Sequence, residues 1–288
     1  MPRTNSAGSR LAKTKVSEEW VSLKGEILQK DIKALASRGT ITKLSLTDAP
    51  LLTVKEAQAF AFLPPVHWLW LWREVARSAM KDVISIPELR TLDMMNLAGR
   101  GKLASFANAE RLEVFRCNHC LTAADLLAVA EGPSLREIGA QGAEISATVL
   151  DRLLAVPKLD SLDLEATEFT DEMARQVSQS TRLLSLDLGA TRITKKGLAH
   201  ICRMGQLRSL DLWETQLDQK DVELLKALPN LEYVSVGTFS GKEKFDAKVL
   251  LRQLAEMPSL RRIWLDGVRV DEWQREELEK RYAYVRIT

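Results

Sequence analysis

Hydrophobic residues recur along this chain in one phrase: apolar, two variable residues, apolar, one variable residue, apolar. Copies begin at Ile41, Val66, Leu89, Leu112, Leu135, Leu159, Leu183, Leu207, Leu231 and Leu260. Most of them are 23 or 24 residues apart. A repeat of this period predicts a solenoid, in which each unit buries its apolar side chains against its neighbours.

Each repeat is expected to combine a short strand with a helix. Apolar residues two apart are typical of a strand that is buried on one side. A residue whose side chain can cap a helix follows each strand, as at Thr53, Thr122, Ser146, Thr170, Thr194, Asp218 and Asp271. Thr53 also has Glu56 three residues later, which predicts a capping box.

The segments LDSLDLEAT, LLSLDLGAT and LRSLDLWET, which begin at Leu159, Leu183 and Leu207, are similar to leucine-rich repeats. The segment from Thr191 to Thr194 resembles bacterial members of that family, which have helical convex faces. The resemblance covers residues 41–288 and implies an α/β horseshoe with a parallel sheet on its concave side and helices outside.

The chain departs from the leucine-rich-repeat pattern at one position, just after the strand. Many members of the family carry asparagine there, whereas this chain has Thr167, Thr191 and Thr215. The backbone groups that the asparagine would bond need other partners.

We expect one elongated domain with three parts. Residues 1–16 are predicted to be a flexible basic tail, residues 17–40 an N-terminal helical cap, and residues 41–288 the solenoid with a short C-terminal closing strand. Apolar residues at helical spacing predict one amphipathic helix over residues 17–36. Tyr282, Val285 and Ile287 repeat the strand phrase and predict the closing strand.

Because side chains alternate along a strand, those at the third, fifth and seventh positions of each phrase are expected to point away from the core. In the four repeats from Leu135 onward these positions hold no lysine or arginine, and they hold Glu137, Asp163, Glu165, Asp187 and Asp211. Neighbouring strands lie about 4.8 Å apart, so Asp163, Asp187 and Asp211 are expected to form a ladder of like charges. A basic partner would relieve the repulsion. In the alternative interpretation, these aspartates are solvated and lean apart.

Five of the seven tryptophans fall at the same outward positions: Trp68, Trp70, Trp72, Trp213 and Trp264. Met95 occupies an outward position on the strand next to the first three. Tryptophan is favoured at binding hot spots, so these residues are candidates for partner binding. In the alternative interpretation, Trp68, Trp70 and Trp72 pack beneath the N-terminal segment as an internal core.

Candidate chemistry is sparse. Cys117 and Cys120 have the spacing of a metal or redox site, but the register places them at positions of buried structural residues, and no second pair completes a zinc site. His67, His119 and His200 fall in unrelated repeats, and no glycine-rich phosphate loop follows a strand. The sequence therefore predicts no enzyme activity, no metal and no cofactor.

Charge and composition limit the classes of partner that we expect. The 288 residues carry 41 Lys and Arg against 39 Asp and Glu, so the chain lacks the basic field of a nucleic-acid-binding protein. No apolar run approaches the roughly 20 residues that span a bilayer. An odd number of cysteines, three, and no secretory signal favour a reduced, cytoplasmic protein.

We therefore predict a non-catalytic scaffold that binds a partner protein with a basic surface through its concave face. In its sharper form this scaffold is an inhibitor or immunity-type protein. The alternative is a substrate-targeting or regulatory subunit of an effector or enzyme complex.

Overall fold

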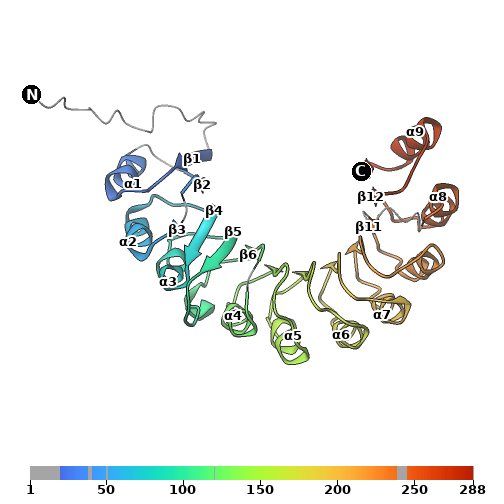
Figure 1. The fold of residues 1–288 in the computed structure, drawn as a ribbon, viewed down its shortest axis with the longest axis horizontal. Helices are drawn as coiled ribbons and strands as arrows, with labels where there is room; N and C mark the ends of the chain where they lie inside the picture. The colour runs from blue at the N-terminus through green and yellow to red at the C-terminus, as the bar shows by residue number, and fades with distance from the viewer. Residues whose placement is uncertain (1–19, 38–40, 50, 120, 239–244, 288) are drawn as a thin grey trace, which may run out of the picture. The chain divides into compact units, whose positions relative to one another are not determined.

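The computed structural model describes residues 20–37, 41–49, 51–119, 121–238 and 245–287 (Figure 1). They form two compact units. The first unit contains the chain up to His119 together with Glu131–Leu135, and the second contains Cys120–Ala130 and Arg136–Thr288. The predicted tail, residues 1–16, lies outside the described residues, and the predicted domain boundaries stay predictions.

Strands of the first unit lie side by side in chain order, and they pair in parallel. They are β1 (Trp20–Lys24), β2 (Lys43–Thr47), β4 (Trp68–Ala76), β5 (Thr91–Ala98) and β6 (Val114–Cys117), with β3 (Leu51–Leu52) beside β4. The connecting helices are α1 (Gln29–Ala36), α2 (Val54–Gln58) and α3 (Met80–Ile84), with 3-10 helices η2 (Ala59–Phe62), η3 (Arg77–Ala79) and η4 (Phe106–Asn108).

The second unit repeats the same arrangement, and four of its strands are only three residues long. Its parallel strands are β7 (Glu137–Gly139), β8 (Ser161–Asp163), β9 (Ser185–Asp187), β10 (Ser209–Asp211), β11 (Tyr233–Gly237), β12 (Arg262–Asp266) and β13 (Tyr284–Ile287). Its helices are α4 (Ala123–Val129), α5 (Ala147–Leu154), α6 (Asp171–Val177), α7 (Lys195–Ile201), the 3-10 helix η5 (Asp221–Ala227), α8 (Ala247–Ala255) and α9 (Glu272–Arg281).

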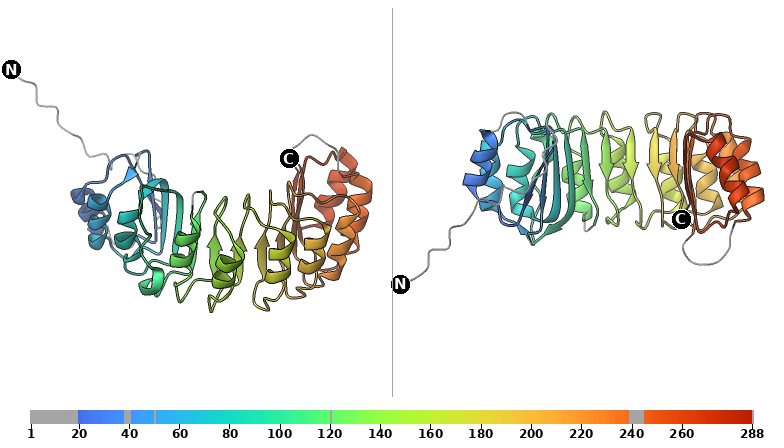
Figure 2. Two further views of the ribbon diagram at one scale, coloured as in Figure 1. Left: turned by 60° about the horizontal axis from the view of Figure 1, so that its bottom comes forward. Right: turned by 90° about the horizontal axis from the view of Figure 1, so that it is seen from above.

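In both units the helices lie along one side of the sheet (Figure 2). We call the opposite side the open face. Apolar strand residues such as Leu162, Leu186 and Leu210 are buried between sheet and helices, where burial of each contributes roughly 2 kcal/mol. The predicted α/β solenoid, with a parallel sheet on one side and helices on the other, is confirmed.

The predicted register of the repeats is confirmed as well. Asp187 lies directly between Asp163 and Asp211 on neighbouring strands. The repeat that begins at Val66 follows the same phase, because Trp68 pairs with Lys43 on one side and with Thr91 on the other. Equivalent positions of successive repeats therefore stack into columns.

The threonines that replace the expected asparagine bond the turn after each strand. Thr167, Thr191 and Thr215 are buried, and each donates its hydroxyl to the carbonyl oxygen three residues earlier. The acceptors are Leu164, Leu188 and Leu212, at 2.7, 2.6 and 2.7 Å. In these repeats the threonine hydroxyl therefore makes the hydrogen bond that holds the turn after the strand.

Most of the predicted helix caps are confirmed. Thr170 and Thr194 accept backbone N–H donors at the starts of α6 and α7, and Thr53 forms the predicted capping box with Glu56. The repeat that begins at Leu207 differs, since its helical segment is the 3-10 helix η5 and Asp218 lies before its first turn.

The prediction of a single helix over residues 17–36 is wrong for its first half. Trp20–Lys24 form β1, which pairs in register with β2, and the helix α1 begins only at Gln29. Val21 and Leu23 are buried with the two-residue period of a strand, and Gly25 then turns the chain at a φ of 83°. The predicted closing strand is confirmed as β13.

Candidate binding surfaces

Four tryptophans gather on the open face of the first unit, and we call them the aromatic platform: Trp20, Trp68, Trp70 and Trp72. The Trp20 ring centroid lies 6.0 Å from that of Trp68 and 5.9 Å from that of Trp70, and the Trp70 and Trp72 centroids are 4.9 Å apart. These tilted and edge-on contacts are favourable aromatic geometries. The strands β1 and β4 position all four rings.

The platform is accessible at one side. Trp72 is 46% exposed, and Trp68 and Trp70 are half-buried, whereas the intervening Leu69 and Leu71 are fully buried on the helix side. The ammonium group of Lys43 lies 5.9 Å from the Trp20 ring centroid and 5.3 Å from that of Trp68. Such cation–π contacts cover the β1–β2 part of the platform and leave Trp72 as its exposed end.

A β-bulge shapes the exposed end of the platform. The register between β4 and β5 shifts between Leu71 and Glu74, so that Trp72 and Arg73 lie opposite one residue of β5. That residue is Met95, which is half-buried. Bulges redirect side chains and are frequent beside functional sites. Here Trp72 points outward and Arg73 is buried.

A polar bridge borders the platform on β5 and β6. The indole N–H of Trp68 donates to the Asp93 carboxylate, and Arg116 Nη1 donates to Asp93 Oδ1 at 2.8 Å. Asp93 therefore fixes the Trp68 ring and joins the platform to a basic side chain.

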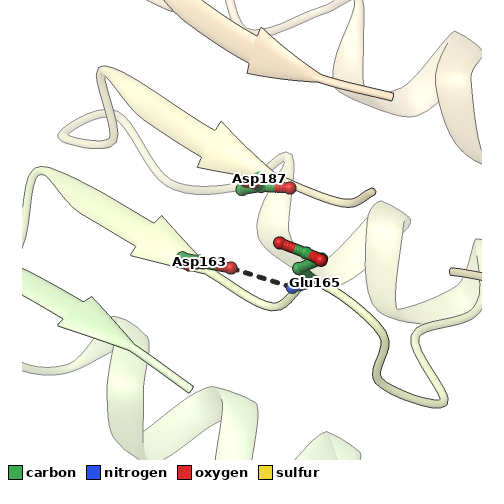
Figure 3. A group of neighbouring side chains, drawn as sticks. All are labelled: Asp163, Glu165 and Asp187. Carbon is green, nitrogen blue, oxygen red and sulfur yellow. Dashed lines mark hydrogen bonds between the residues drawn. The ribbon is translucent and has the colours of Figure 1, made fainter. Parts of the chain in front are cut away.

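Four carboxyl groups gather on the open face of the second unit, and we call them the acidic patch: Asp163, Glu165, Asp187 and Asp211. One carboxylate oxygen from each of Asp163, Glu165 and Asp187 lies within 4.8 Å of the others (Figure 3). Gln141 Nε2 donates to Asp163 Oδ2 at 3.2 Å and to Glu165 Oε2 at 2.8 Å. An oxygen set of this kind suits a cation, whether a metal ion or a side-chain cation.

The aspartates of the patch also bond their own turns. The Oδ1 atoms of Asp163, Asp187 and Asp211 accept the backbone N–H two residues later, at 2.9, 2.9 and 3.1 Å. This local role explains why the carboxylates do not lean apart. The predicted ladder of aspartates is thus present, with a structural function beside its charge.

Burial and like charge raise the pKa values in the patch. Burial and, next, the charges of Asp211 and Asp163 raise the pKa of Asp187 to about 8, although the hydrogen bond donated by Gly189 N lowers it. Burial and the charges of Asp163 and Asp211 raise the pKa of Glu165 to about 7. Burial raises the pKa of Asp211 to about 6, although Trp213 N, Ser235 and Tyr233 lower it. These three carboxyl groups therefore titrate near neutral pH.

Asp187→Asn is expected to stabilise the second unit at pH 8 and to have little effect at pH 4. A carboxyl group with a raised pKa in the folded state binds more protons when folded, so its stabilising effect is lost as pH rises from about 4 to about 8. Asparagine keeps the acceptor for Gly189 N and carries no charge. Thermal melts should show a gain of about 2–4 °C at pH 8. Glu279→Gln, on α9, is the matched control and should show no gain at either pH.

The remaining predicted binding residues are spread over the second unit's open face. Glu137 lies on β7 outside the patch. Trp213 borders it, since its indole lies on the backbone of Gly189, where an added Cβ would be 2.2 Å from Trp213 Nε1. Trp264 lies on β12, donates to Asp266 Oδ1 at 2.9 Å, and is covered by the Arg286 guanidinium at 4.0 Å from its ring centroid.

Sequence reasoning missed Trp20 in the platform and Gln141 beside the patch. The predicted helix over residues 17–36 includes Trp20, although the alternation of Val21 and Leu23 after it indicates a strand. Gln141 holds a seventh, outward position one strand before Glu165. Its place in the column was the signal for a bond across strands.

The two cysteines that the structure describes are buried, as the sequence predicts. The side chains of Cys117 and Cys202 are buried, and burial raises the pKa of the Cys202 thiol to about 12. Cys120 lies outside the described residues. Among the described helices, none is long and apolar enough to cross a membrane.

Neither the known family models nor the curated proteins include a match to this sequence. Among solved structures, the chain is similar to the crystal structure of an internalin from Listeria monocytogenes strain 4b F2365. The TM-score is 0.54 at 17% sequence identity, and the match covers 93% of this chain and 82% of the internalin chain. At this identity the likeness shows the fold alone. In fold, the chain is an α/β leucine-rich-repeat solenoid.

Proposed function

We propose that the protein is a non-catalytic scaffold that binds another protein through the open face of its repeats. The aromatic platform supports this proposal most strongly. Four clustered tryptophans at a surface, with Trp72 46% exposed, form the kind of rigid aromatic surface that anchors protein partners. A preformed sheet also loses little conformational entropy on binding.

The acidic patch supports a partner with a basic surface. Three of its four carboxyl groups lie on neighbouring strands, and Glu165 follows the first of these strands. Clustered charge of one sign steers a partner of the opposite sign. A cytoplasmic inhibitor or immunity-type protein that binds a basic toxin is the sharper form of this proposal. A substrate-targeting or regulatory subunit would use the same surfaces.

The surroundings of the carboxyl groups favour binding over catalysis. The raised pKa values of Glu165 and Asp187 would suit proton transfer, but acid–base catalysis also needs a substrate held beside the groups. Among the described residues, two of the hollows, of about 300 and 400 Å³, are lined by residues 84–89 with 108–112 and by residues within 151–155 and 176–182. Neither includes a member of the patch or the platform.

The triple variant Asp163→Asn, Asp187→Asn, Asp211→Asn tests the acidic docking surface. Because asparagine retains the oxygen that accepts each turn N–H, the fold should be preserved. At pH 9, above the raised pKa values of Asp187 and Asp211, removing the carboxylate charges is expected to weaken partner binding by tenfold or more at low salt, and by less at high salt, where the charges are screened. Affinity should be measured at two salt concentrations. Equal affinity of both proteins at low salt would contradict the docking role.

A further inference from the structure

Arginine and aromatic side chains alternate on the open face at the C-terminal end of the second unit. Across β11, β12 and β13, Tyr233 pairs in register with Arg262, and Arg262 pairs with Tyr284. In the next outward row, Trp264 pairs with Arg286. We call these five residues the arginine–aromatic patch.

Each arginine of this patch lies over an aromatic ring. The Arg262 guanidinium is 5.4 Å from the Tyr233 ring centroid, and the Arg286 guanidinium is 4.0 Å from that of Trp264. The Trp264 ring is itself fixed, because its indole N–H donates to Asp266 Oδ1 at 2.9 Å. A guanidinium that stacks on a ring can still direct the N–H groups at its edge to an acceptor. The rings thus hold two sets of donors in place.

These donors are available to a ligand. Arg262 and Arg286 are exposed, and so is Tyr284, at 49%. Within the described part of the chain, neither guanidinium forms a hydrogen bond or an ion pair. The charge of Arg286 acts on Asp266, whose pKa is raised by burial and lowered by Trp264 and Arg286. Asp266 is only 1% exposed, so the exposed edges of both guanidinium groups still lack an acceptor.

Tyr233 joins this patch to the acidic patch. Its hydroxyl donates to Asp211 Oδ2 at 3.4 Å, and its ring lies beneath Arg262. The strands β12 and β13 are the second and third beyond β10, which places them roughly 10 and 14 Å from it. The open face of the second unit therefore presents negative groups on β8 to β10 and positive groups on β12 and β13.

We propose that the arginine–aromatic patch docks an acidic segment of the partner protein, whose carboxylates accept from the guanidinium groups of Arg262 and Arg286. The inference rests on the proposed function and adds to it a second contact of opposite charge. Arginine matches the geometry of a carboxylate, and the neighbouring rings offer apolar contact. Two contacts of opposite sign favour one orientation of the partner, because like charges would meet in the reverse one.

A nucleic acid fits this face less well than an acidic protein segment. Nucleic-acid binding depends on many phosphate contacts, and this patch has two arginines. A phosphate backbone that continued over β10 and β9 would meet Asp211 and Asp187. A short run of acidic side chains can bind over β12 and β13 without reaching those strands.

Fluorine NMR of the full chain, labelled with fluorotryptophan, tests this contact at the level of single residues. Hexaglutamate is the acidic probe, and it is added at low salt, where charges are least screened. The Trp264 resonance, assigned through Trp264→Phe, is expected to shift because Arg286 covers that ring. The resonance of Trp273, on α9, should not move.

The double variant Arg262→Gln, Arg286→Gln removes the proposed donors. It is expected to lose about tenfold in affinity for hexaglutamate, since hydrogen bonds between charged groups are lost. The matched control is Arg203→Gln, Arg252→Gln, which removes two exposed arginines after α7 and on α8, and it should bind as wild type does. Thermal melts verify that both proteins are folded, and Arg286→Gln alone is the second variant if the first double variant is not.

Hexalysine at pH 9 is the parallel probe of the acidic patch, and its reporter is Trp213, whose indole lies on Gly189. A shift of Trp213 with hexalysine, but none of Trp264 with hexaglutamate, would overturn this inference and leave the acidic docking surface standing. The reverse result would contradict the acidic docking surface alone. Unchanged hexaglutamate affinity in Arg262→Gln, Arg286→Gln would also overturn the inference. So would tighter binding of a thymidine hexanucleotide than of hexaglutamate at Trp264.

Discussion

Replacing Glu56 by alanine is expected to lower the free energy of unfolding of the first unit by about 3–5 kcal/mol. Arg73 is buried on β4, and its Nη2 lies 3.0 Å from Glu56 Oε1. Glu56 also accepts the backbone N–H of Thr53 at 2.9 Å and that of Ile27 at 3.1 Å. Without the carboxylate, a buried guanidinium loses its counter-ion, and α2 loses its capping box.

The pH dependence of this effect has a defined sign. Burial raises the pKa of Glu56, but the backbone bonds from Thr53 and Ile27 and the Arg73 side chain lower it by more. Its stabilising effect is therefore full above the unfolded-state pKa of about 4.3 and is lost as pH falls through the lower folded-state value. Chemical denaturation of Glu56→Ala and wild type should give converging stabilities in acid.

Two controls sharpen the test of the buried pair. Glu172→Ala removes an exposed ion pair with Arg175 and should leave stability unchanged within error. The double variant Glu56→Leu, Arg73→Met removes both charges and should recover much of the loss, because buried pairs are often replaceable by apolar side chains. Equal losses for Glu56→Ala and Glu172→Ala would contradict the assigned role.

Replacing Trp72 by alanine is expected to weaken partner binding by roughly 30- to 150-fold, equivalent to about 2–3 kcal/mol for a hot-spot tryptophan. Stability should change much less, because Trp72 is the most exposed ring of the platform and points away from the core. Isothermal titration with the captured partner measures the first effect, and a thermal melt measures the second.

The chain provides a matched control for Trp72 in Trp273. That residue lies on α9, on the helix side, and is 66% exposed. Trp273→Ala removes the same side chain from the other side of the sheet and should leave affinity unchanged. If Trp72→Ala loses much of its stability while its affinity is preserved, the platform is a structural core and the alternative interpretation of the sequence holds.

Much of this architecture could be predicted because the repeat fixes a phase. Once Leu162, Leu186 and Leu210 are assigned to the core, the alternation of side chains gives the side of the sheet on which each neighbouring residue lies. Asp163, Asp187 and Asp211 do lie in one row on neighbouring strands. Trp68, Trp70 and Trp72 likewise follow from the buried Leu69 and Leu71. The period of two makes these predictions independent of any knowledge of the partner.

The features that escaped prediction depend on departures from the period or on distance in space. The repeat phrase at β1 has Glu18 at its first position, so the strand that carries Trp20 was masked by a helical spacing of apolar residues. Arg73 lies just beyond the seventh position, after the bulge, and only the fold brings it to Glu56. The raised pKa values of Glu165 and Asp187 depend on side-chain distances that sequence spacing alone does not supply.

Site-specific photo-crosslinking tests the binding role of the open face most directly. A photo-reactive amino acid replaces Met95, on the open face of β5 opposite the bulge at Trp72, or Trp273 on the helix side. Each protein is irradiated in a lysate of its native cell. The open-face role predicts that one protein partner is captured from position 95 and not from position 273. Capture of that partner from position 273 alone would contradict it.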